Sequence, residues 1–200
     1  MADSTPLPPD HLSPEEVEAR REAQAVDGLI ALFDGLFLGS ENTILRRSPD
    51  EPIYLPADAE NPQARILFAH GFFQSALHEI AHWCVAGPQR RQQVDFGYWY
   101  APDGRTTEQQ RVFEGVEVKP QALEWIFSVA CGRRFRVSVD NLSGEPGDSS
   151  GFKQAVHEQV LKYLGEGLKP RPGALVEALI GRYRPGLVLG AELFVLADLG

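Results

Sequence analysis

Residues 72–87, FFQSALHEIAHWCVAG, contain the pattern H-E-x-x-H, which is formed by His78, Glu79 and His82. In a helix, residues four apart lie on one face, about one turn apart. This spacing allows two imidazoles to bind one metal ion while the intervening glutamate lies beside it. The chain has only five histidines. We therefore predict that His78 and His82 are metal ligands rather than ordinary core or surface residues.

The same helix is predicted to be buried on more than one side. A helical projection groups the apolar residues in a stripe that the two histidines almost oppose: Phe73, Leu77, Ile80, Ala81 and Cys84. A helix with apolar residues on most sides is buried, so other elements should also cover the histidine face. Two charged imidazoles in such a site would repel each other. A metal ion, which requires neutral ligands, removes that repulsion.

A third metal ligand is expected farther along the chain. Val85 and Pro88 occupy the Gly and His positions of the G-x-x-H continuation that metzincins have, so no third histidine follows at that spacing. The best candidates are Glu114 and Glu117, in the acidic segment FEGVEVKP at 113–120.

On a continuous helix, Glu114 and Glu117 would share one polar face with Gln121 and Glu124, and such a face is ordinarily solvated. Pro120 is expected to kink the helix or to begin a new one, which would turn Glu117 inward. We therefore favour Glu117 as the third ligand, with Glu114 as the alternative. Two histidines and one carboxylate would leave positions on the metal open for water, oxygen or substrate.

Glu79 is the predicted catalytic residue, and its role depends on the metal. In a zinc metallopeptidase it would be the general base that acts on metal-bound water. In an oxygen-activating site it would lie next to the ligands. A triad of two histidines and one carboxylate is the signature of oxygen-activating iron(II). Both the iron and the zinc interpretation remain open on these residues alone.

Five further residues are candidates for substrate binding. Aromatic side chains in the segment DFGYWY at 95–100 could form a pocket wall that favours a cationic group. An acidic residue beside them could pair with a substrate ammonium group, and a histidine in the turn before the central helix could point into the same cavity. The candidates are His70, Asp95, Tyr98, Trp99 and Arg105.

The composition predicts a soluble globular domain. Hydrophobic residues make up 43% and charged residues 24% of the 200 residues, as is usual for such a domain. The net charge of −9 argues against nucleic-acid binding, which needs clustered lysine and arginine. Cys84 and Cys131 give no disulfide framework, which fits a reducing cytosol. No signal peptide and no run of membrane-spanning length are expected, so we predict a cytoplasmic protein without membrane contact.

The order of elements predicts an α+β fold, a helix-dominated single domain with a small sheet and a central H-E-x-x-H helix. Residues 1–12 are expected to be a disordered tail and residues 13–200 the metal-binding domain. Predicted helices are 13–33, 72–87, 106–130 with an interruption at Pro120, 152–164, 173–182 and 191–197. Predicted strands are 43–46, 53–55, 65–69, 95–100 and 135–139.

Four blocks of the sequence together resemble the bacterial elongation factor P hydroxylase family. They are AHGFFQSALHEIAHWCVAG at 69–87, DFGYWYAPDGR at 95–105, FEGVEVKPQALEW at 113–125 and FRVSVDNLSG at 135–144. The resemblance runs from about residue 50 to residue 144. Four blocks in this order are far more specific than the H-E-x-x-H pattern alone.

The resemblance implies hydroxylation of the lysine of elongation factor P that already carries a β-lysyl group. It also implies a non-haem site of two histidines and one carboxylate, in a fold unlike the usual 2-oxoglutarate oxygenase barrel. Iron(II) would be the metal, with zinc as the alternative, and elongation factor P and molecular oxygen would be the partners. By position, His78 and His82 match the histidines of the family, while Glu114 and Glu117 both fall in its acidic block.

Overall fold

A computed structural model describes residues 13–95, 105–139 and 149–199. These ranges contain the α-helices α1 (Pro14–Glu41), α2 (Phe73–Val85), α3 (Thr107–Cys131), α4 (Ser150–Glu166) and α5 (Pro170–Tyr183). They also contain the strands β1 (Thr43–Ser48), β2 (Ile53–Leu55) and β3 (Ala64–Ala69), and short 3-10 helices at Arg90–Gln92, Ala191–Leu193 and Leu196–Leu199. The predicted helix-dominated α+β fold is confirmed. The predicted tail at 1–12 lies outside the described residues.

Helix α1 begins as the sequence predicts but ends later. Ser13 caps it, because its hydroxyl accepts a hydrogen bond from the Glu16 N–H (3.2 Å) and its own N–H donates to the Glu16 carboxylate (2.7 Å). The helix continues past residue 33 because Phe37 is also buried, and Asn42 ends it in a left-handed conformation.

Among the described residues, α1 is the one helix that is long and apolar enough, by length and composition, to cross a membrane. The expectation that no run approaches that length is therefore wrong for α1. Core helices and signal sequences near an N-terminus both have this property, and α1 packs against β1 and α2.

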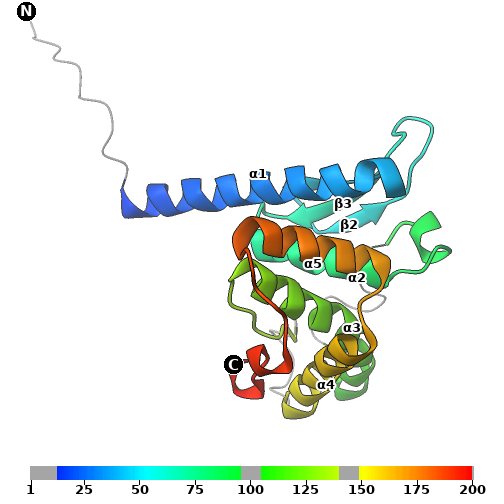
Figure 1. Ribbon diagram of the computed structural model, residues 1–200. Helices are drawn as coiled ribbons and strands as arrows, with labels where there is room; N and C mark the ends of the chain where they lie inside the picture. Colours follow the sequence, from blue (N-terminus) through cyan, green and yellow to red (C-terminus); the bar gives the residue numbers. More distant parts are fainter. Residues whose placement is uncertain (1–12, 96–104, 140–148, 200) are drawn as a thin grey trace, which may run out of the picture.

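The three strands form a mixed sheet in the order β1-β3-β2. Strand β3 runs parallel to β1 and antiparallel to β2. Its alternate residues Ala64, Ile66 and Phe68 are buried, as expected for a strand with one covered face. Figure 1 shows α1 along one side of the molecule next to the sheet, with α3 and α4 at the opposite end and α2 between them.

A tight turn leads from β3 directly into α2. His70 and Gly71 both adopt left-handed backbone conformations, with φ of 53° and 70°, which reverse the chain within two residues. The hydroxyl of Ser75 then accepts a hydrogen bond from the Ala69 N–H (3.2 Å), so the first turn of α2 is fixed to the end of the strand. The sheet thereby sets the position of the H-E-x-x-H helix.

Helix α3 is not interrupted at Pro120, contrary to the prediction. Proline removes the N–H that would bond to the carbonyl four residues earlier. That residue is Val116, which is 47% exposed, so solvent can satisfy the carbonyl. Pro120 itself is buried, and the helix continues on both sides of it.

Residues 135–139 do not form the predicted strand. The backbone of this segment is bonded by side chains of α3 instead. The Gln121 amide accepts from the Ser138 N–H (3.0 Å) and donates to the Ser138 carbonyl (2.7 Å), and the Val139 carbonyl accepts from Gln110 (3.0 Å). The predicted strand at 95–100 lies outside the described residues except for Asp95, which forms an isolated antiparallel bridge with Tyr54.

Candidate metal centre

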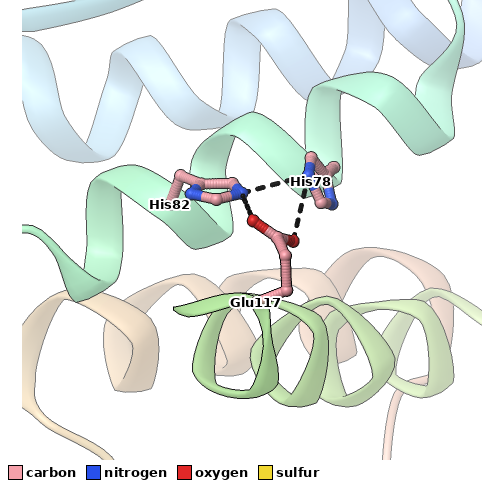
Figure 2. A group of neighbouring side chains, drawn as sticks. All are labelled: His78, His82 and Glu117. Carbon is pink, nitrogen blue, oxygen red and sulfur yellow. Dashed lines mark hydrogen bonds and ion pairs between the residues drawn. The ribbon is translucent and has the colours of Figure 1, made fainter. Parts of the chain in front are cut away.

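Two helices bring His78, His82 and Glu117 together. The histidines lie one turn apart on α2, and Glu117 projects toward them from α3 (Figure 2). His82 Nε2 lies 3.1 Å from His78 Nε2 and 3.2 Å from Glu117 Oε1. His78 Nε2 lies 3.8 Å from Glu117 Oε2. Among the residues that the structure describes, this is the group whose donor atoms converge within 4.8 Å in a way that could hold a metal ion.

The spacing of these three side chains fits a single metal ion. Two atoms that each lie about 2.1 Å from one ion, at an angle of about 90 to 110°, are about 3.0 to 3.4 Å apart. The two shorter distances, 3.1 and 3.2 Å, fall in this range. Two nitrogens and one oxygen suit zinc or non-haem iron(II). Glu114 lies outside the group and accepts a hydrogen bond from Gln110 instead (3.2 Å).

Glu124 fixes the orientation of His78. Its Oε2 lies 2.7 Å from His78 Nδ1, and its Oε1 accepts a hydrogen bond from the Gln74 amide (2.6 Å), which also donates to Ser128 (3.0 Å). A carboxylate only accepts hydrogen bonds, so the imidazole carries its proton on Nδ1 and, when neutral, presents the lone pair of Nε2. This is the carboxylate–histidine arrangement that orients metal ligands in proteins.

Gln121 supports Glu117 in a similar way. Its amide donates to Glu117 Oε2 (3.3 Å) and to the Ser138 carbonyl (2.7 Å). The third ligand of the group, the Glu117 carboxylate, is thus joined through Gln121 to the segment 135–139. Neither Glu124 nor Gln121 is predicted from the sequence to have a role in the site. Their seven-residue and four-residue spacing from Glu117, which places all three on one face of a helix, was the available signal.

The face of α3 that meets α2 is polar and buried. Glu117, Gln121 and Glu124 are 2%, 1% and 5% exposed, while Val112 and Val116 on the other side are 41% and 47% exposed. The face of α3 formed by Glu117, Gln121 and Glu124 is therefore polar and inside, the reverse of a surface helix. Buried charged groups are costly unless they are paired, and here each carboxylate has an imidazole or amide partner.

Electrostatics couple the imidazoles to the carboxylates. Burial lowers the pKa of His78, but the charge and hydrogen bond of Glu124, together with the charge of Glu117, raise it to about 10. Burial raises the pKa of Glu117, but the charge and hydrogen bond of His82 and the charge of His78 lower it to about 2. The site thus strongly favours a positive charge between its carboxylates, and a metal ion would displace the second proton of the charged His78 imidazole, the one on Nε2.

Glu79 lies beside the group without joining it. It lines a small cavity together with His82, Trp83 and Tyr54, and burial raises the pKa of its carboxyl group. The His78 and His82 side chains are 25% and 21% exposed, so the group can be reached from solvent.

The predicted substrate-binding residues have different surroundings in the structure. His70 is exposed in the turn before α2, near Phe72 (6.1 Å between ring centroids), and is not part of the ligand group. Asp95 forms a two-point ion pair with Arg90 (2.6 and 2.7 Å), so an arginine already compensates its charge. Tyr98 and Trp99 lie outside the described residues.

Arg105 is in the interior of the domain. It is 4% exposed, stacks 3.8 Å above the Phe113 ring and donates to Gln110 and to the Val139 carbonyl. Its contacts are with α3 and the segment that α3 holds.

Comparison with known proteins identifies the family. The family model for elongation factor P hydroxylase matches residues 32–194. The chain belongs to the elongation factor P hydroxylase family. A curated relative, the elongation factor P lysine hydroxylase of Haemophilus influenzae, is 56% identical over 158 residues, which cover 79% of this chain and 89% of that protein. The matched region contains both α2 and α3, so the resemblance noted from the four sequence blocks is confirmed.

Proposed function

We propose that this chain is a metal-dependent hydroxylase that acts on a lysine of elongation factor P. The observation that carries the proposal is the convergence of His78, His82 and Glu117 in a member of the elongation factor P hydroxylase family. The favoured metal is iron(II), because two histidines and one carboxylate leave several positions open. We further propose that the substrate lysine carries a β-lysyl group and that the protein acts in the cytoplasm with molecular oxygen.

The residues of the chain perform three tasks in this proposal. His78, His82 and Glu117 hold the metal, which when bound would supply the activation of dioxygen for insertion of one oxygen atom into a C–H bond. Glu124 keeps the proton of His78 on Nδ1, away from the metal. Gln121 holds the Glu117 carboxylate by a hydrogen bond. Because the imidazoles are partly exposed, a long lysine side chain can reach the site from solvent.

Glu79 has no hydrolytic role in this proposal. It lies next to His82 in the small cavity, where it can shape the approach to the site. The zinc metallopeptidase interpretation of the H-E-x-x-H pattern remains the alternative that experiment must exclude.

The direct test is oxygen addition to the protein substrate. Iron-loaded enzyme, β-lysylated elongation factor P, air and a reductant should give a product heavier by one oxygen atom, measured by intact-protein and peptide mass spectrometry. His82→Ala and Glu117→Gln should each lower the rate more than about 100-fold, beyond the usual effect of residues that only orient a ligand. Glu114→Gln is the matched control and should retain activity.

Two results would contradict the proposal. The first is full activity in His82→Ala, because the metal would then be held elsewhere. The second is an unchanged substrate mass with the iron-loaded enzyme combined with peptide cleavage by the zinc-loaded enzyme.

A further inference from the structure

A basic groove adjoins the metal-binding helices of this acidic protein. It consists of two depressions of about 260 and 290 Å³ that share Cys84, Val85 and Lys169 and therefore adjoin each other. Its walls come from the end of α2, the middle of α3, the end of α4 and the beginning of α5. The cations that line it are Lys119, Lys162, Lys169, Arg91 and Arg171.

The charge of the groove is opposite to that of the whole chain. Five lysines and arginines line it against two acids, Glu41 and Glu166, so its balance is 5 − 2 = +3, while the chain carries −9. Glu166 lies 4.0 Å from Lys162 in an exposed pair, which neutralises little. Lys119 and Lys169 are exposed and have no ion pair within the described part of the chain.

The arginine side chains of the groove are held in place by contacts, whereas its lysine side chains can change conformation. Arg171 donates to the Ala86 carbonyl at the end of α2 (2.7 Å) and lies 4.6 Å above the Trp83 ring, and Arg91 pairs with Glu41 (2.6 Å). These guanidinium groups are held by the fold. The lysines project from three separate segments at the rim, where their long side chains can adapt to a partner.

The groove adjoins the two helices that carry the candidate metal ligands, on other faces of these helices than the ligands occupy. Its floor residue Cys84 follows His82 by two residues, about 3 Å along the helix axis. Lys119 likewise follows Glu117 by two residues on α3. A protein bound in the groove would therefore lie next to the helices that carry the ligands.

We propose that this groove docks an acidic segment of the protein substrate. The proposal rests on the proposed function and adds the surface that recognises the substrate. A small anion would be held by fixed, convergent donors. The fixed arginines instead bond to the Ala86 carbonyl and to Glu41, and their unpartnered nitrogens, Arg171 Nη1 and Arg91 Nε, are buried. Separate, adaptable lysines instead suit several carboxylates spread along a polypeptide, and they would attract it electrostatically.

The test is charge reversal at the rim, in the double variant Lys162→Glu with Lys169→Glu. For intact β-lysylated elongation factor P, its KM and dissociation constant should rise about 10- to 100-fold while kcat at saturation stays unchanged. The affinity of the native enzyme should fall with added NaCl, and that of the double variant should depend less on salt. The matched control is Arg20→Glu with Arg21→Glu, on the exposed first half of α1, which should leave KM within about twofold.

Each outcome decides one point. If the native enzyme does not hydroxylate elongation factor P, the proposed function fails. If the native enzyme is active and the double variant has the native KM and dissociation constant, the docking proposal fails alone. A loss of kcat without a change in KM, or a lowered melting temperature, would show a structural effect and also overturn it. Stronger inhibition by inorganic phosphate than by NaCl at equal ionic strength would indicate a small-anion site instead.

Discussion

The two sides of helix α2 are buried by different kinds of contact. On one side, Phe73, Leu77 and Ile80 are fully buried in the apolar core. On the other side, His78 and His82 face the carboxylates and amide of α3, which are also buried. Charged groups near the apolar side are found at its rim, where Arg133 lies 3.8 Å above the Phe73 ring and pairs with Glu22.

The apolar contacts on one side of α2 stabilise the fold, whereas the polar contacts on the other side serve the candidate metal site. Burial of an apolar side chain such as Leu77 contributes roughly 1.5 to 3 kcal/mol. Burial of an ion pair contributes little net stability and often costs some, because both charges lose water. The stability of the fold therefore does not account for the burial of Glu117 and Glu124. The proposed metal site accounts for it better. Three substitutions test this division, in order of decreasing expected effect.

The largest effect is expected on the apolar side, with Leu77→Ala. Leu77 is fully buried, so the substitution should lower the free energy of unfolding by about 3 kcal/mol through lost burial and a cavity. Hydroxylation per folded molecule and metal affinity should remain, since no ligand is changed. Urea unfolding and metal titration measure the two quantities. Leu161→Ala, at a position that is 38% exposed on α4, is the control and should cost less than about 1 kcal/mol.

On the histidine side of α2, Glu124→Gln should act in the opposite way to Leu77→Ala, with a larger effect on metal affinity than on the free energy of unfolding. The amide retains the shape but removes the charge that fixes the Nδ1 proton of His78, so metal affinity should fall 10- to 100-fold, or about 1.4 to 2.8 kcal/mol. The free energy of unfolding of the metal-depleted protein should change less than in Leu77→Ala. Competition with a chromophoric chelator measures the affinity. Unchanged affinity would refute the role of Glu124, and Glu108→Gln, at the exposed start of α3, is the control.

The same division explains which features could be predicted from the sequence. The apolar stripe of α2 has helical periodicity, and all five of its predicted members are buried. The buried polar face of α3 has the same periodicity as a solvated face. Only its contact with α2, between residues 46 apart in the case of His78 and Glu124, distinguishes the two. The expectation that Pro120 begins a new helix is wrong, because α3 is continuous at Pro120, and Glu117 is buried on this continuous helix.

The segment 135–139 shows a second limit of sequence patterns. FRVSV alternates apolar and polar residues like a strand, and Phe135 is indeed buried. Its backbone partners are the side chains of Gln121 and Gln110. A glutamine amide offers a donor and an acceptor much as a neighbouring strand does. The pattern thus predicts an extended segment but does not reveal what binds it.

The smallest effect is expected at the rim of the apolar side, with Glu22→Gln. The Glu22 carboxylate accepts hydrogen bonds from the Phe73 N–H (3.0 Å) and from Arg133 (2.9 Å). Burial raises the pKa of Glu22, but these two partners lower it below the ordinary value of 4.5. Because the folded-state pKa is the lower one, this contribution is complete above about pH 4.5 and is lost as the pH falls through the folded-state pKa.

Glu22→Gln should therefore lower the free energy of unfolding by about 1 kcal/mol at pH 7, the modest amount typical of a partly exposed pair. The difference from the native protein should shrink toward zero in more acidic solution, where the native carboxyl group is protonated and resembles the amide. Urea unfolding at pH 7 and at pH values below 4.5 measures it. Glu18→Gln, an exposed carboxylate on the same helix, should change the free energy by less than about 0.5 kcal/mol at either pH. If the difference for Glu22→Gln does not depend on pH, packing rather than charge stabilises the start of α2. The apolar side of α2 would then be stabilised without any contribution from charge, in contrast to its histidine side.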